Sequence, residues 1–316
     1  MKKYNRNLRH RRSIYRKNSI FVYLLIALCA VLAIVVVFVL VGNALGKKAE
    51  ADESGNKDST NNASDVTERP LPLSVNSGFV QLSVDNSRLS DRLSGVSTAG
   101  YNAACFELDS KNGDVLYSSD VAVSMGYLPS NSGLWELDDV ASLFDSHGLY
   151  SIGVSHLSRL NTDNDLRRSL AIGYYAAQTA EAIRAGIDDV LLRPDGIPVE
   201  RYSELVDIAH KVHELCPDGT VGVAVPVSVL TSESASSVVD LLWSEFNYIA
   251  VDLTSAPEEN ETEVQKIDRE LGGILYYLLR YNLRVLVPYT DDTSLATEIA
   301  NAVRRSGSQN IQVIPQ

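Results

Sequence analysis

Residues 150–193 read YSIGVSHLSRLNTDNDLRRSLAIGYYAAQTAEAIRAGIDDVLLR, and this stretch decides the fold. It begins with a short apolar run, Tyr150–Leu157, and ends with another, Asp189–Arg193. Between them, Asp165–Ala185 has helical periodicity and is followed by Gly186, a residue type that commonly ends helices. Short strands that are apolar on both faces are typical of parallel sheets, in which a helix connects each strand to the next. The stretch therefore predicts a parallel strand, helix and strand unit.

The same pattern repeats along the chain from residue 78 to residue 316. This length is close to the roughly 250 residues typical of an eightfold β/α barrel. No G-x-G-x-x-G or Walker loop follows a strand-like run, which argues against a nucleotide-binding doubly wound sheet. We therefore expect an α/β fold, a (β/α)8 TIM-like barrel that ends at its eighth strand. The expected strands are Phe79–Val84, Ala103–Leu108, Tyr150–Leu157, Asp189–Arg193, Val221–Val227, Tyr248–Leu253, Arg284–Tyr289 and Asn310–Ile314.

Helices are expected between these strands, because the intervening segments carry helical start and stop signals. Pro198 precedes one of them, and Gly148 and Gly186 follow two others. The expected helices are Leu134–His147, Asp165–Ala185, Val199–Leu215, Glu233–Glu245, Glu263–Tyr281 and Ser294–Arg305.

A different kind of sequence precedes the barrel. Residues 21–41 contain no charge and are long enough to cross the roughly 30 Å hydrocarbon core as a helix. Basic side chains concentrate before this run, which favours a cytoplasmic amino terminus and an extracytoplasmic barrel. The expected domains are a basic cytoplasmic tail (1–19), a transmembrane signal-anchor helix (20–45), a flexible polar linker (46–77) and the barrel (78–316). Ala44-Leu45-Gly46 leaves a cleavable signal peptide as the alternative.

Charge and cysteine content exclude several functions. The whole chain has a formal net charge of −12, and because residues 1–19 are basic, the rest of the chain is still more acidic. Such a surface disfavours nucleic acid, because binding to nucleic acid depends on Lys and Arg at the phosphates. The three cysteines have neither a disulfide framework nor metal-ligand spacing. We therefore expect no nucleic-acid partner, no metal and no cofactor.

Three segments of the sequence resemble segments of one known protein family. Residues 102–117, NAACFELDSKNGDVLY, are similar to the family's second-strand segment. Residues 146–152, SHGLYSI, and 176–190, AAQTAEAIRAGIDDV, are similar to the segments that lead into its third and fourth strands. The family is that of bacterial putative glycosyl-hydrolase barrel domains, and the resemblance implies a (β/α)8 barrel related to the glycosidases.

The chain departs from this family at the positions that matter for catalysis. An aspartate near the end of the family's fourth strand is replaced by Arg193, and the family's Asp-x-Lys on the second strand becomes Glu107-x-Asp109. A basic residue early in the third strand becomes Val154. The resemblance therefore implies a degenerate member of the family.

Strand alternation predicts a polar cluster at one end of the barrel. Side chains two apart share a face, so we expect Glu107 and Asp109 to point together into the mouth. In such barrels the carboxyl ends of the strands line the site. Glu107, Asp109 and Asp252 are the candidate catalytic residues. The candidate substrate-binding residues are His156, Arg193, Asp195, Tyr289 and Asp291.

Three functions fit these residues. The first is a catalytically degenerate barrel on the cell membrane that binds a cell-envelope glycan or a protein partner whose identity the sequence leaves unknown. The second is an active glycoside hydrolase that uses Glu107 as acid with Asp252 or Asp109 as base. The third is a structural envelope protein without a sugar site. Whichever function holds, Glu107 and Arg193 have an alternative explanation as a buried salt bridge that fixes the mouth.

Overall fold

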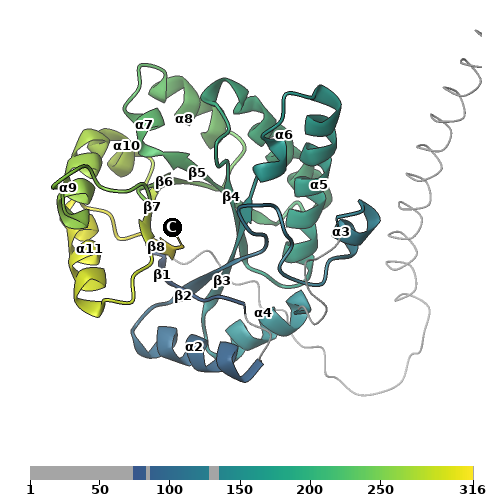
Figure 1. Cartoon of the computed structure of the whole chain (residues 1–316), viewed down its shortest axis with the longest axis horizontal. Helices are drawn as coiled ribbons and strands as arrows, with labels where there is room; N and C mark the ends of the chain where they lie inside the picture. The colour runs from purple at the N-terminus through teal and green to yellow at the C-terminus, as the bar shows by residue number, and fades with distance from the viewer. Residues whose placement is uncertain (1–73, 83–85, 128–134, 316) are drawn as a thin grey trace, which may run out of the picture. The chain divides into compact units, whose positions relative to one another are not determined.

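The computed structural model describes residues 74–82, 86–127 and 135–315. Its centre is a closed barrel of eight parallel strands in the order β1 to β8 (Figure 1), which confirms the fold predicted from the sequence. The strands are β1 (Asn76–Phe79), β2 (Ala103–Glu107), β3 (Tyr150–His156), β4 (Asp189–Arg193), β5 (Thr220–Pro226), β6 (Tyr248–Asp252), β7 (Arg284–Pro288) and β8 (Ile311–Ile314).

Helices surround this barrel and alternate with its strands. Because every strand runs in the same direction, the chain leaves each strand at one end of the barrel and returns along a helix to the other. The helices are α2 (Asn86–Thr98), α3 (Asp120–Ser124), α4 (Leu137–Ser146), α5 (Asp165–Arg184), α6 (Ser203–Leu215), α7 (Val227–Leu230), α8 (Ala235–Trp243), α9 (Glu263–Gly273), α10 (Leu275–Arg280) and α11 (Thr293–Arg305), with short 3-10 turns η1 (Ser158–Leu160) and η2 (Val199–Arg201).

The first strand lies earlier than the sequence pattern predicted. The expected run Phe79–Val84 is wrong, because β1 covers Asn76–Phe79 and begins inside the segment assigned to the linker. Val75 and Phe79 pack inside the barrel, whereas Val80 packs on the outer side with the helices. The apolar run after Phe79 therefore leaves the sheet, and it leads to α2, a helix that the sequence analysis missed.

Gly78 allows α2 to pack closely on β1. A Cβ at this position would lie 3.0 Å from a methyl of Val96 on α2. A larger residue would push α2 away from the strand.

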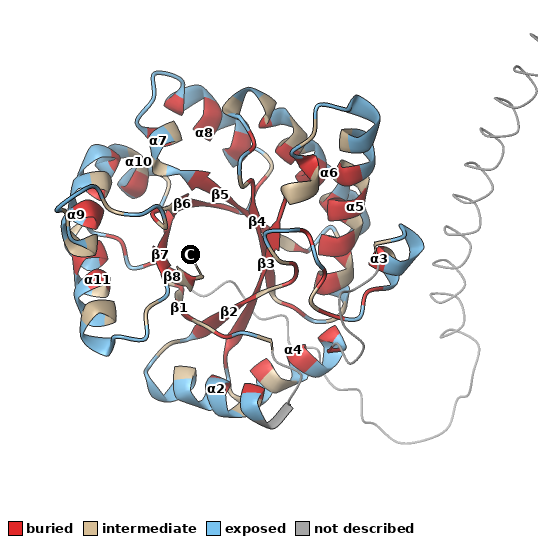
Figure 2. Ribbon diagram, viewed as in Figure 1, coloured by how far each residue is buried: buried red, intermediate tan, exposed pale blue. Residues whose placement is uncertain are grey.

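Most of the apolar core lies between the barrel and its helices. The strands are buried along almost their whole length (Figure 2). Phe106 on β2 and Phe144 on α4 have ring centroids 5.4 Å apart, and Tyr174 and Tyr175 on α5 are also fully buried. This layer fixes the strands, and thereby fixes the side chains at their ends.

The half of the barrel interior near the amino ends of the strands is closed by a polar network. Arg284 Nη1 donates to Asp189 Oδ2 at 2.7 Å, and the Tyr248 hydroxyl donates to Asp189 Oδ1 at 2.9 Å. The guanidinium of Arg284 lies 3.4 Å above the Tyr248 ring. That ring occupies the space over Gly222, where a Cβ would come within 2.0 Å of a ring carbon. The barrel is therefore a packed core and not a pore.

The predicted tail (1–19), the signal-anchor helix (20–45) and most of the linker (46–77) lie outside the described residues. Among the helices of the described ranges, none is both long and apolar enough to cross a bilayer.

Candidate functional site

Five of the eight predicted site residues are linked by contacts to one another at the carboxyl ends of the strands. Glu107 ends β2, and His156 and Arg193 end β3 and β4, where they are paired in register. Asp252 ends β6, and Asp195 follows β4 by two residues. We call these five residues the mouth cluster.

His156 lies between two carboxylates of the mouth cluster. Its Nε2 is 3.1 Å from Glu107 Oε1, and its Nδ1 is 2.5 Å from Asp195 Oδ2. The His156 side chain is fully buried, whereas that of Glu107 is 19% exposed and that of Asp195 is 37% exposed. The histidine therefore ties β2, β3 and the loop after β4 together beneath two carboxylates that reach solvent.

The electrostatics of this triad favour a charged histidine. Burial lowers the pKa of His156, but the hydrogen bonds to Asp195 and Glu107 outweigh it and raise the pKa to about 8. For Asp195, burial raises the pKa, but the hydrogen bond to His156 and the charge of Arg193 together lower it below its ordinary value. Asp195 is thus ionised at neutral pH.

Arg193 forms the second half of the cluster. Its Nη2 donates to Asp252 Oδ2 at 2.7 Å and to Thr254 Oγ1 at 3.2 Å, and it lies 3.7 Å from Asp195 Oδ1. Its Nε and Nη1 have no hydrogen-bond partner within the described residues. The alternative of a salt bridge between Glu107 and Arg193 is not what the described residues show, since Arg193 pairs with Asp252 and Asp195 instead.

Asp109 does not point into the mouth, which corrects the expectation that it shares a face with Glu107. The strand ends at Glu107, and the chain then turns so that Asp109 lies against the end of β3. Its Oδ1 accepts the backbone N–H of His156 at 2.5 Å, and the Ser155 hydroxyl donates to its Oδ2 at 3.3 Å. Burial raises the pKa of Asp109 to about 7. The carboxyl group is fully buried and positions the β3 backbone under His156.

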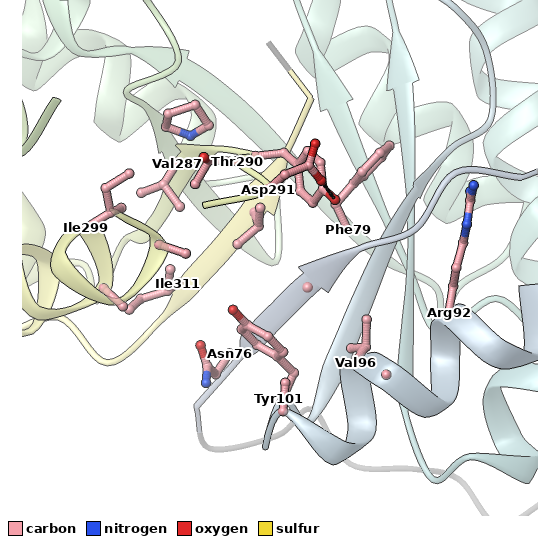
Figure 3. Close-up of a pocket in the computed structure, with 18 of the residues that line it drawn as sticks. Asn76, Phe79, Arg92, Val96, Tyr101, Val287, Thr290, Asp291, Ile299 and Ile311 are labelled. Atoms are coloured by element: carbon pink, nitrogen blue, oxygen red, sulfur yellow. Dashed lines mark hydrogen bonds between the residues drawn. The ribbon is translucent and has the colours of Figure 1, made fainter. Parts of the chain in front are cut away.

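Tyr289 and Asp291 are also outside the mouth cluster. Both lie in the loop after β7, where the Tyr289 hydroxyl donates to Asp291 Oδ1 at 2.6 Å. With Phe79 and Arg92 they line one end of a cavity of about 530 Å³ that runs between α2 and α11 over β1 and β8 (Figure 3). Among the described residues, no hydrogen bond or ion pair links these two predicted binding residues to the mouth cluster.

Two residues that the sequence analysis missed hold the β6 end of the site. Thr254 donates its backbone N–H and its hydroxyl to Asp252 Oδ1, at 2.8 and 2.6 Å. Lys266 on α9 is fully buried, and its Nζ donates to the backbone carbonyls of Leu253 and Ser255. The spacing of Thr254 from Asp252 could have indicated a local turn, but nothing in the sequence distinguishes Lys266 from an exposed helix lysine.

This arrangement supplies hydrogen-bond acceptors and cations at the mouth. The partly exposed carboxylates of the mouth cluster each contact a cationic or potentially cationic side chain, whereas Asp109, whose pKa burial raises to about 7, lies buried behind His156. Within the described residues no group of three or more His, Cys, Asp and Glu side chains has the arrangement of a metal site.

Comparisons with known proteins identify the fold. No protein-family model matches the chain, and no curated protein matches it by sequence. The glycoside hydrolase domain of PgaB (BpsB) from Bordetella bronchiseptica superposes with a TM-score of 0.56 at 11% identity, covering 77% of this chain and 94% of that domain. The spore cortex-lytic enzyme SleL from Bacillus cereus gives a TM-score of 0.46 at 10% identity, covering 77% of this chain and 71% of that enzyme. The first likeness shows that the chain has the barrel fold of a glycoside hydrolase domain, as the sequence resemblance implied.

Proposed function

We propose that this protein binds a cell-envelope glycan in the mouth cluster without cleaving it, and that residues 21–41 anchor it in the membrane with the barrel outside. The barrel fold is shared with a glycoside hydrolase domain, but a fold does not determine a function. The proposal therefore depends on the side chains of the mouth.

One observation carries the proposal: every carboxylate of the mouth cluster is held next to a cation or a protonatable histidine. Glu107 and Asp195 contact His156, and Asp252 contacts Arg193. Hydrolysis of a glycosidic bond requires a carboxyl group that stays protonated until it protonates the leaving oxygen. In the mouth cluster these carboxylates are already engaged by His156 or Arg193. Carboxylate oxygens that are held in place and partly exposed suit hydrogen bonds from sugar hydroxyls.

The anchor follows from the sequence. An uncharged run of 21 residues preceded by a basic tail is typical of a signal anchor with the amino terminus in the cytoplasm. This topology would place the barrel next to the polymers of the cell envelope.

A direct test measures binding and cleavage in the same samples. The full chain in detergent is incubated with purified envelope polysaccharides, and bound polymer and released reducing ends are both quantified. We expect binding without release, and at least a tenfold loss of affinity in Asp252→Asn, since a charge-assisted hydrogen bond contributes about 1.5–3 kcal/mol. Asp291→Asn is the matched control, because Asp291 lies outside the mouth cluster.

An active glycoside hydrolase is the second candidate. It is favoured by the partial exposure of Glu107 and Asp252, 19% and 14%, which places two carboxylates at the mouth from β2 and β6. Release of reducing ends that disappears in Glu107→Gln would establish hydrolysis and overturn the proposal. If the folded protein shows neither binding nor release, both candidate functions are overturned and the structural role remains.

A further inference from the structure

A patch of large apolar and aromatic side chains lies on the surface of α8 and α10. Leu275, Tyr276 and Leu279 of α10 and Trp243 of α8 are between 42% and 59% exposed. Trp243 is joined to the end of α10 by its ring contact with Tyr281, whose centroid is 5.3 Å away. We call Trp243, Leu275, Tyr276, Leu279 and Arg280 the α8–α10 patch.

The composition of this patch is that of a membrane interface. Tyr and Trp concentrate at the boundary between lipid and water, because their rings are apolar and carry one polar atom. Arg280 adds a cation directly beside the aromatic rings, with its guanidinium 5.5 Å from the Tyr276 centroid and 5.3 Å from that of Tyr281. A long basic side chain of this kind can extend toward the headgroups while its stem covers apolar surface.

The patch lies at the end of the barrel opposite the mouth cluster. The carboxyl end of α8 leads into β6 and that of α10 leads into β7, so both ends lie near the amino ends of the strands. Leu279 also lies against Gly307, just after the end of α11, at the same end of the barrel. The chain enters β1 at Asn76 from this end too.

The length of the preceding chain favours a lipid surface as the occupant. The apolar run ends at Val41, and a fully extended chain of the 34 residues from there to Val75 spans at most about 120 Å, so in the anchored topology proposed above the amino end of the barrel can be no farther than this from the bilayer. A surface held near a bilayer needs little affinity of its own, because tethering raises the effective concentration.

We propose that the α8–α10 patch lies on the outer surface of the lipid bilayer and that the mouth cluster thereby faces away from the membrane. This inference rests on the anchored topology of the proposed function. It adds an orientation that the anchor alone does not impose: the patch contacts lipid, and the mouth is presented to polymers beyond it.

The two tryptophans of the chain allow a test with the full-length protein. Trp243 is in the patch, whereas Trp135 is buried and precedes α4 at the mouth end. The chain is reconstituted into phosphatidylcholine vesicles whose acyl chains are brominated, since bromine quenches indole fluorescence only at near contact. Trp135→Phe reports Trp243 alone, and Trp243→Phe reports Trp135 alone.

We expect brominated vesicles to quench Trp243 and to leave Trp135 unchanged. Tyr276→Ser combined with Leu279→Ser, in the Trp135→Phe background, should abolish the quenching. Leu166→Ser is the matched control, because Leu166 is 71% exposed near the start of α5 at the mouth end. This control should leave the quenching of Trp243 intact.

The remaining outcomes separate this inference from the proposed function. A chain that stays with the vesicles but shows no quenching of Trp243 overturns the bilayer contact and leaves the anchor standing. A chain that does not stay with the vesicles overturns the anchor and the orientation together. A dimer that dissociates on Tyr276→Ser/Leu279→Ser would assign the patch to a second copy of the chain and overturn the lipid contact.

Discussion

The barrel contains two arginine–aspartate pairs with the same separation and different surroundings. Arg284 and Asp189 are 2.7 Å apart near the amino ends of the strands, and Arg193 and Asp252 are 2.7 Å apart at the carboxyl ends. The first pair is closed off by Tyr248, whose hydroxyl and ring complete its contacts. The second leaves two guanidinium nitrogens of Arg193 without a described partner and leaves Asp252 partly exposed. The same chemical pair is fully enclosed in one half of the barrel and partly exposed in the other.

The largest expected effect comes from breaking the closed pair. Asp189→Asn leaves the Arg284 charge buried without its counterion, and we expect a loss of about 3–5 kcal/mol in the free energy of unfolding. Urea denaturation of the purified chain measures this loss. Asp252→Asn is the matched variant and should cost about 1–3 kcal/mol, since Arg193 keeps Thr254 and Asp195 nearby. Equal losses in the two variants would show that the different surroundings of the two pairs do not affect stability.

Gly222→Ala tests the packing that closes the inner half. Its Cβ would enter the space of the Tyr248 ring, so we expect about 1–3 kcal/mol of destabilisation from overpacking. Gly173→Ala on α5 is the control, because nothing lies within 4 Å of its Cβ and alanine favours a helix. A Gly222→Ala protein as stable as the wild type would show that the ring can move aside.

The pH dependence of the free energy of unfolding should reflect the charge of His156 in the mouth cluster. Hydrogen bonds from His156 to carboxylates raise its pKa from 6.5 to about 8, so its contribution is fully present below about pH 6.5 and is lost as the pH rises through 8. Over the whole pKa change from 6.5 to about 8, this contribution to the free energy of unfolding is about 2 kcal/mol, at 1.36 kcal/mol for each pKa unit.

Unfolding measured at pH 6 and pH 9 in the wild type and in Glu107→Gln isolates this contribution. The variant removes one of the two carboxylates, so the fall in stability between these pH values should be smaller. Asp109, whose pKa is raised to about 7, also lowers the free energy of unfolding as the pH rises toward 7. This effect is present in both proteins and cancels in the difference between them. If stability falls by the same amount between pH 6 and pH 9 in the wild type and in Glu107→Gln, Glu107 is excluded as a source of the raised pKa of His156.

The smallest expected effect concerns the residue that positions Asp252. Thr254→Val removes a hydroxyl that donates to Asp252 and accepts from Arg193. We expect about 0.5–1.5 kcal/mol of lost stability and a weaker affinity for glycan, because Asp252 is no longer held toward Arg193. Thr254→Ser should restore both quantities. Restoration by serine distinguishes the hydroxyl from the shape of the side chain.

The barrel could be predicted from the sequence because its signal is local. Each strand after the first is a short run of apolar residues, and the helices that follow carry their own start and stop residues. The first strand was misplaced for the same reason: Phe79–Val84 is as apolar as a strand, but only pairing with β2 and β8 selects Asn76–Phe79. The sequence contained no local measure of that pairing.

The mouth cluster was predicted in part. The alternation of side chains along a strand placed Glu107, His156, Arg193 and Asp252 at the same end, and the structure brings them there. The same rule failed for Asp109, because β2 ends at Glu107 and alternation holds only within a strand. The rule also grouped Tyr289 and Asp291 with the mouth cluster. They lie in the loop after β7, and the alternation of side chains along a strand does not determine the course of a loop.

By itself, the sequence determined the fold class, the ends of the strands at which polar groups gather, and the uncharged run that suits a membrane. These properties follow from the period and polarity of neighbouring residues. The tertiary structure alone decided which partner each charge takes: His156 between Glu107 and Asp195, Arg193 with Asp252, and Lys266 with two backbone carbonyls. Such choices depend on distances between strands far apart in the chain, and the strength of a charge interaction is set by those distances and by burial.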